Sequence, residues 1–133
     1  MLRSVYRGSL NSKSGRNLRM NIPAPVADFF RMKNEQDHDG LWALFASDAT
    51  VVDGGEGKKV QGAEEIKKWI QKALSGLNLH TEIRDCKEES GEWVVDTVMT
   101  GDFKASPARF EYFITVTRNK ISALRVEFRG SLR

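Results

Sequence analysis

Apolar residues recur with two different spacings along the chain, and the spacing changes near residue 79. In the first part, Val26, Phe29, Phe30 and Lys33 recur at helical spacing behind two prolines. Proline is tolerated in the first turn of a helix because the amide that it lacks would have no partner there. The spacing therefore predicts a helix over about 23–36.

Two further helices are predicted in this part of the chain. The run DHDG offers N-cap residues, and Leu41, Leu44 and Phe45 then recur at i, i+3 and i+4. This spacing indicates a short helix that ends near Ser47. The clearest helix, Ala63–Leu74, has an apolar stripe opposite a charged one. The stripe consists of Ile66, Trp69, Ile70, Ala73 and Leu74.

A strand and its return are predicted between the second and third helices. The segment 49–52 is β-branched and apolar, and it stops at a glycine-rich turn over 53–57. The glycines permit a tight reversal, after which 58–61 is the expected return strand.

From Leu79 onward apolar and polar residues alternate with a period of two, which predicts long strands. Turn signals at Ser90-Gly91, Ser106-Pro107 and Asn119-Lys120 separate these strands, so the second half is expected to be an antiparallel meander. Helices followed by strands predict an α+β domain in which three helices pack on one face of a curved antiparallel sheet.

Length and composition limit the possible classes of protein. A chain of 133 residues and 15.0 kDa, of which 40% are hydrophobic and 29% charged, fits one compact domain and excludes a two-domain enzyme. The single cysteine, Cys86, cannot form an internal disulfide, which fits a reducing compartment. No apolar run approaches the ~18 residues of a membrane-spanning helix. We therefore expect a soluble, cytoplasmic protein with no membrane partner.

The net charge of +3 and the pI of about 9.1 come from the N-terminus. Residues 1–19 hold five basic residues and no acid, whereas the remainder holds 16 basic and 18 acidic residues. A mildly acidic body gives no reason to expect a nucleic-acid partner. Residues 1–19 are interpreted as a flexible basic extension, with a targeting peptide or a partner-binding arm as alternatives. The folded domain is expected over 20–133.

Several motifs point to a known family. The stretch LWALFASDATVVDGGEGKKVQGAEEIKKWIQKAL contains an ALFA-D-A-T helix end, a strand that stops at Asp53 before a glycine-rich turn, and G-x-x-x-I at Gly62 and Ile66. An R-N-K-I turn and an L-R-V-E-F strand follow near the C-terminus. Over residues 22–129 the chain resembles the nuclear transport factor 2-like superfamily, in its SnoaL-like polyketide cyclase and ketosteroid isomerase group.

The resemblance implies a cone-shaped α+β barrel with an apolar pocket between the helices and the concave sheet. Such a pocket would take a small, largely apolar, carbonyl-containing ligand. The resemblance also implies a homodimer through the outer faces of the sheets. In the isomerases the aspartate at the position of Asp53 is the general base that moves a proton next to a carbonyl. The alternative is that Asp53 is a turn residue whose side chain bonds nearby amides.

Proton abstraction also needs donors for the developing oxyanion. The first-helix tyrosine of the isomerases falls here at Phe29, which has no hydroxyl, so true steroid isomerisation is not expected. The second donor falls near Glu111, or at Tyr112 if the register shifts by one. Alternation favours Tyr112 on the inner face, with Glu111 kept as the alternative. A cyclase-like or aldol-type proton transfer with Asp53 would remain, or simple ligand binding or dimerisation without catalysis.

The resemblance places four further side chains around the pocket, for which core packing is the alternative role. They are Phe29, Trp69, Leu124 and Phe128. No cofactor is expected. No metal site is expected either, because the adjacent residues Asp37, His38 and Asp39 at a helix start point in different directions.

Overall fold

A computed structural model describes residues 22–54, 57–74 and 76–133. The basic extension 1–19 lies outside these ranges. The helices are α1 (Ala24–Glu35), α2 (His38–Ala43) and α3 (Ala63–Ala73). The strands are β1 (Phe45–Asp53), β2 (Lys58–Gln61), β3 (His80–Glu89), β4 (Glu92–Thr100), β5 (Ala108–Thr117) and β6 (Lys120–Ser131). No helix in these ranges is long and apolar enough to cross a membrane.

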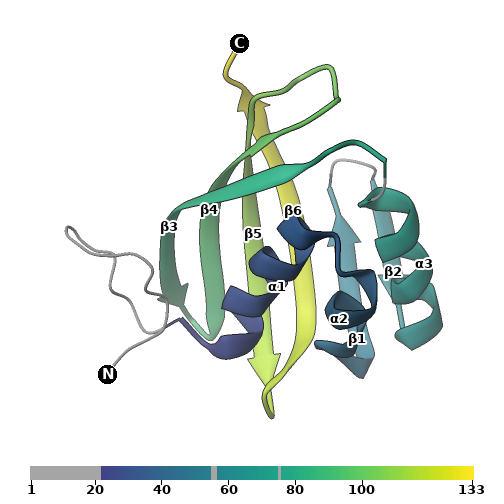
Figure 1. Ribbon diagram of the computed structural model, residues 1–133. Coiled ribbons are helices and arrows are strands. Elements are labelled where there is room, and N and C mark those ends of the chain that lie inside the picture. The colour runs from purple at the N-terminus through teal and green to yellow at the C-terminus, as the bar shows by residue number, and fades with distance from the viewer. Residues whose placement is uncertain (1–21, 55–56, 75) are drawn as a thin grey trace.

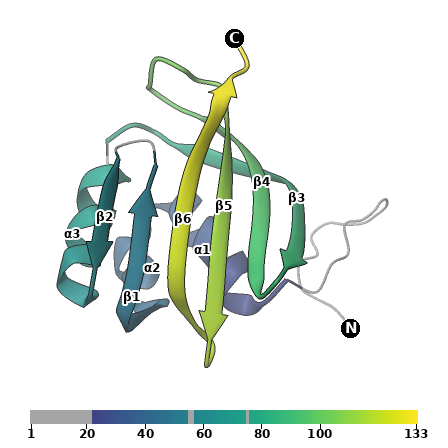
Figure 2. The ribbon, with the colours of Figure 1, turned by 180° about the vertical axis from the view of Figure 1, so that it is seen from behind.

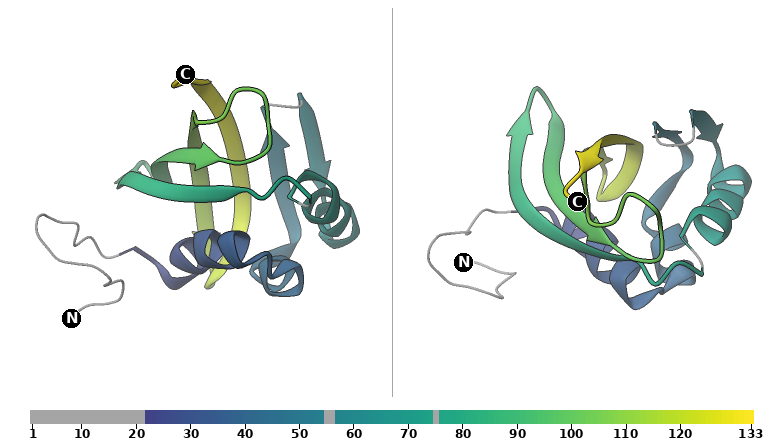
Figure 3. Two further views of the ribbon diagram at one scale, coloured as in Figure 1. Left: turned by 45° about the horizontal axis from the view of Figure 1, so that its top comes forward. Right: turned by 90° about the horizontal axis from the view of Figure 1, so that it is seen from above.

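The strands form one six-stranded sheet in the order β2-β1-β6-β5-β4-β3. The helices precede the meander along the chain and lie on one side of the sheet, which is turned toward the viewer in Figure 1 and away from the viewer in Figure 2. Seen from above, the sheet curves around that side (Figure 3). The predicted α+β class, with three helices on a curved sheet, is confirmed.

The pairing of the sheet is mixed, where an antiparallel sheet was predicted. Strand β1 runs parallel to β6, with Val51 beside Leu124 and Asp53 beside Val126. The other strand pairs in the described residues are antiparallel. A crossover of this kind cannot be read from local alternation because it joins two segments about 70 residues apart.

The boundary between α2 and β1 differs from the prediction. Helix α2 ends at Ala43 and the strand begins at Phe45, so the segment expected to finish the helix is extended. The carbonyl of Ala43 accepts a hydrogen bond from the Lys120 side chain at 2.7 Å, and that of Leu44 accepts one from the Ile121 amide at 2.8 Å. Bonds from β6 thus occupy carbonyls at the end of α2, and Phe45 joins the core as a strand residue.

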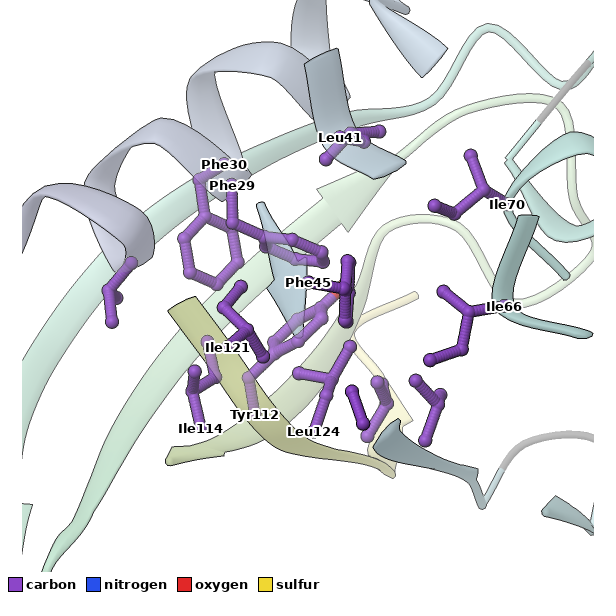
Figure 4. Close-up of a cluster of buried hydrophobic side chains, with 14 of the residues drawn as sticks. Phe29, Phe30, Leu41, Phe45, Ile66, Ile70, Tyr112, Ile114, Ile121 and Leu124 are labelled. Atoms are coloured by element: carbon purple, nitrogen blue, oxygen red, sulfur yellow. The ribbon is translucent and has the colours of Figure 1, made fainter. Parts of the chain in front are cut away.

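The core lies between α1 and the concave face of the sheet. The ring of Phe29 meets those of Phe30, Phe45 and Tyr112 edge to face, with centroids 5.1, 6.3 and 5.9 Å away. Figure 4 shows the α1 rings directed toward side chains of β5 and β6. Edge-to-face contacts of this kind stabilise a core beyond the area that they bury.

An amide side chain joins α1 to the edge strand β3. Asn34 donates its Nδ2 to the Thr81 carbonyl at 2.9 Å and accepts the Thr81 amide on Oδ1 at 2.7 Å. Both backbone groups of Thr81 therefore point away from β4 and are paired by one side chain, as a neighbouring strand would pair them. Asn34 fixes Thr81 against the last turn of α1.

Replacing Asn34 by Ala should lower the free energy of unfolding by about 1–2 kcal/mol, because two partly buried backbone groups lose their partner. Amide hydrogen exchange should show the Thr81 amide losing its protection. The matched control is Arg31→Ala on the same helix, whose exposed ion pairs with Asp28 and Glu35 contribute at most about 0.5 kcal/mol. Unchanged exchange at Thr81 in Asn34→Ala would contradict this role.

Candidate functional site

Asp53 and Tyr112 lie on the same face of the sheet, two strands apart. Asp53 ends β1 beside Val126 of β6, and Val126 in turn pairs with Tyr112 of β5. Strands are spaced about 4.8 Å apart, which puts the two backbones on the order of 10 Å from each other. Both side chains point to the concave side, where α1 and α3 pack. The sheet therefore presents a carboxylate and a phenol to one region.

Asp53 is held by α3. The indole Nε1 of Trp69 donates to Asp53 Oδ2 at 3.0 Å. Trp69 faces β1 because it belongs to the predicted apolar stripe of α3, with Ile66 and Ile70. A donor on one carboxylate oxygen fixes the direction of the carboxylate. Asp53 is half-buried, so this carboxylate lies at the boundary between the core and solvent.

Tyr112 points inward, where alternation predicted it. Its ring packs edge to face against Phe29 and Phe30, and its residue is 2% exposed. Its hydroxyl is hydrogen-bonded to the Thr81 side chain, and burial raises the pKa of the phenol well above its usual value. Tyr112 therefore stays protonated near neutral pH and carries a hydroxyl that can donate a hydrogen bond.

Glu111 lies on the opposite, convex face. Its Oε1 accepts a hydrogen bond from Arg129 Nε at 2.9 Å, beside a second ion pair between Arg109 and Asp96. The carboxylate is thus separated from Asp53 by the sheet itself. Of the two alternatives at this strand position, the structure brings Tyr112, and not Glu111, onto the same face as Asp53.

The four expected lining residues lie in different environments. Phe29 and Leu124 are inside the core, at 0% and 1% exposure, and Trp69 is buried while bonding Asp53. Phe128, in contrast, is 45% exposed. Its ring meets Phe110 edge to face at 5.5 Å, and Phe110 meets Phe103 at 6.4 Å. These three aromatic rings form an apolar group at the end of the sheet where β6 finishes.

The structure adds Lys33, whose role the sequence interpretation missed. The residue is 4% exposed, and its Nζ donates to Thr81 Oγ1 at 2.6 Å, with Met99 Sδ at 4.0 Å. None of the ion pairs between described residues includes it. Desolvation lowers the pKa of the ammonium to about 8. The signal was its place at helical spacing behind Val26, Phe29 and Phe30.

Neither Cys86 nor a cluster of metal-ligating side chains in the described residues adds a reactive group to the site. Burial, aided by the charge of Asp85, raises the pKa of the Cys86 thiol to about 12, so the nucleophilic thiolate is scarce near neutral pH. Within the described residues no three His, Cys, Asp or Glu side chains are grouped so that they could hold a metal ion. The chemistry available on the concave side is therefore a carboxylate, a phenol and an amine.

The comparisons with known proteins agree with this fold. The sequence profile of the SnoaL-like domain matches residues 26–126, which is most of the chain. The chain belongs to the SnoaL-like domain family. This SnoaL-like domain is similar to a solved Sinorhizobium meliloti protein called a "putative polyketide cyclase", with 26% identity over 80% of this chain and 96% of that one and a TM-score of 0.73.

Two further solved relatives of this SnoaL-like domain share its fold. A Catenulispora acidiphila protein with a ketosteroid isomerase-like fold, in complex with trimethylamine, is 22% identical over 83% of this chain and 87% of that one, with a TM-score of 0.70. A Cytophaga hutchinsonii NTF2-like protein of unknown function is 13% identical over 79% and 87%, with a TM-score of 0.64. No curated protein matches the chain.

The buried Lys33 should make the stability of the domain depend on pH. The pKa of Lys33 is lowered from 10.5 to about 8, so between these values the unfolded chain binds more protons than the folded one. The free energy of unfolding should therefore rise with pH, by about 1 kcal/mol from pH 7 to pH 9. Above pH 9 the raised pKa of Cys86 acts in the opposite direction, because only the unfolded thiol ionises there.

Lys33→Met keeps the side-chain volume and removes the charge. We expect this variant to be more stable than wild type at pH 7 and to lack the rise between pH 7 and pH 9. Urea unfolding at pH 7, 8 and 9 measures both effects. Parallel pH profiles for the two proteins would show that Lys33 keeps an ordinary pKa in the folded state.

Proposed function

We propose that this SnoaL-like domain binds a small, largely apolar, carbonyl-containing ligand on the concave side of its sheet and moves a proton next to the carbonyl. One observation carries the proposal: Asp53 and Tyr112 project from the same face, each beside Val126. The S. meliloti relative, called a putative polyketide cyclase, supports a carbonyl chemistry of this kind.

In this proposal Asp53 is the general base. Its carboxylate takes a proton from the carbon next to the ligand carbonyl, and negative charge develops on the carbonyl oxygen. The Tyr112 hydroxyl donates a hydrogen bond to that oxygen, and Trp69 keeps the carboxylate oriented during the transfer. Phe29 supplies no second hydroxyl, so the reaction class is a cyclase-like or aldol-type proton transfer rather than steroid isomerisation.

A non-catalytic ligand-binding module is the second candidate function. Phe29 is fully buried against three other rings, and the Tyr112 hydroxyl is already bonded to Thr81. A domain that only binds would keep the fold and need no base. The two functions differ in what they require of Asp53, since its carboxylate is essential only for proton transfer.

The decisive measurement is deuterium exchange into 2-tetralone, an apolar ketone with acidic α-protons, followed by NMR in D₂O. We expect wild type to accelerate the exchange and Asp53→Asn, which keeps the shape and loses the base, to lower the rate by about 10²–10⁴-fold. Tyr112→Phe should retain the base and lose part of the rate.

Glu111→Gln is the matched control because it makes the same carboxylate-to-amide change on the strand of Tyr112 but on the convex face. Its exchange rate should equal that of wild type. If 2-tetralone shifts the Trp69 indole resonance while Asp53→Asn exchanges as fast as wild type, the domain binds carbonyl compounds without this base. An equal loss in Glu111→Gln and Asp53→Asn would also count against the assignment.

We further propose that two copies associate through the convex face of the sheet. There Val94 pairs with Phe113, and Arg125 covers the Phe113 ring at 3.8 Å. This apolar centre is bordered by the ion pairs of Arg109 and Arg129. Sedimentation equilibrium should give a dimer for wild type and a monomer for Phe113→Glu, whose circular dichroism stays native. A folded dimer in Phe113→Glu would place the interface elsewhere.

A further inference from the structure

The buried position of the Lys33 ammonium lowers the stability of the folded domain. It projects from the last turn of α1 into the interior, where burial removes water from its ammonium. One of its three N–H groups donates to Thr81 Oγ1 at 2.6 Å, and the sulfur of Met99 lies 4.0 Å from the same nitrogen. A buried cation without a carboxylate costs stability, and an apolar side chain of the same size would avoid that cost.

The acceptor of Lys33 is itself rigidly placed. Asn34, the next residue along α1, bonds both the amide and the carbonyl of Thr81. The Thr81 hydroxyl also bonds the Tyr112 hydroxyl, so amine, hydroxyl and phenol form a continuous chain from α1 through β3 to β5. Tyr112 is the titratable group at the sheet end of this chain, and Asp53 acts on it electrostatically.

The second neighbour of the amine is a methionine side chain. Met99 contacts Nζ through its thioether, and methionine is an unbranched, flexible side chain that adapts to neighbouring groups. A small ligand that displaces Met99 would meet the amine while Thr81 still accepts a hydrogen bond from it. The amine of Lys33 thus has one partner of fixed position, Thr81, and one with a flexible side chain, Met99.

We propose that the Lys33 amine condenses with an aldehyde or ketone to form an imine inside the domain. The class of ligand rests on the proposed function, whereas the covalent step is an addition to it. The proposal rests on the geometry of the buried amine. The amine donates to the Thr81 hydroxyl, which is fixed by Asn34 and also bonds the Tyr112 hydroxyl, on the same side of the sheet as Asp53.

The step balances without an added oxidant or reductant. The neutral amine attacks the carbonyl carbon, a C–N bond forms, and the carbonyl oxygen becomes the hydroxyl of a carbinolamine. That hydroxyl takes a proton and leaves as water when the C=N bond forms. Overall, the Lys33 ammonium and the carbonyl compound give a protonated imine and one water. The Thr81 and Tyr112 hydroxyls are placed to pass the protons.

The lowered pKa makes Lys33 selectively reactive near neutral pH. With a pKa of about 8, about one tenth of the Lys33 amine is neutral at pH 7. An exposed lysine with a pKa of about 10.4 is neutral in fewer than about one molecule in a thousand at the same pH. Reductive trapping at pH 7 should therefore favour Lys33 over the surface lysines.

The test incubates the full chain at pH 7 with 3-phenylpropanal, an apolar aldehyde, and sodium cyanoborohydride. Intact mass and peptide mapping then locate the adducts. We expect Lys33 to be modified at least tenfold faster than Lys72, an exposed lysine of α3. Lys33→Arg keeps the charge and should lose this adduct, whereas the control Lys72→Arg should trap like wild type. Circular dichroism and urea unfolding confirm that each variant is folded.

Thr81→Val tests the chain of hydroxyls, and we expect it to slow trapping while Lys33 remains modifiable. The Trp69 indole resonance separates the two proposals. If the aldehyde shifts that resonance but Lys33 reacts no faster than Lys72, the imine is wrong and the carbonyl site stands. If trapping is selective while Asp53→Asn exchanges 2-tetralone like wild type, the imine stands and the general base is wrong. If the aldehyde neither shifts the Trp69 resonance nor reacts selectively with Lys33, both proposals are wrong.

Discussion

The parallel pairing of β1 with β6 is the constraint on which the other features of the site depend. It joins the helical half of the chain to its last strand and sets Asp53 beside Val126. Backbone hydrogen bonds fix both ends of the pairing, from the Ile121 amide to Leu44 and from the Gly54 amide to Val126. Because β6 also pairs with β5, a slip of one residue would disturb two ladders and turn the core side chains of β6 outward. The relation between the carboxylate and the phenol is therefore as rigid as the sheet.

Local periodicity was sufficient to predict the helices and strands in which the spacing of apolar residues matches the buried face. Helix α3 and the meander strands have one apolar face each, so spacing alone identified them. The predicted end of α2 was wrong because long-range contacts, and not the local sequence, determine it. Leu41, Leu44 and Phe45 have helical spacing, but hydrogen bonds from β6 decide where the helix stops. Such bonds come from the far end of the chain and leave no local signal.

The residues of the candidate site also differ in whether the local sequence pattern could predict them. Alternation along β5 was enough to put Tyr112 and Glu111 on opposite faces. A resemblance to known proteins, and not spacing, singled out Asp53, and its bond to Trp69 follows from helix packing. Lys33 stood at helical spacing on an apolar face, where a lysine conflicts with the pattern, and this conflict was the missed signal. Thr81 could not be found, because its role arises only when α1 packs on β3.

The two outer strands of the sheet have a consequence for how copies of the protein can meet. Strand β3 carries charged side chains along most of its length, with ion pairs between Arg84 and Glu82 and between Lys87 and Glu89. At the other border, β2 is only four residues long and begins with two lysines. Charge and shortness both discourage an incoming strand from extending a sheet. These two borders thereby disfavour growth into a continuous sheet by strand pairing between neighbouring copies.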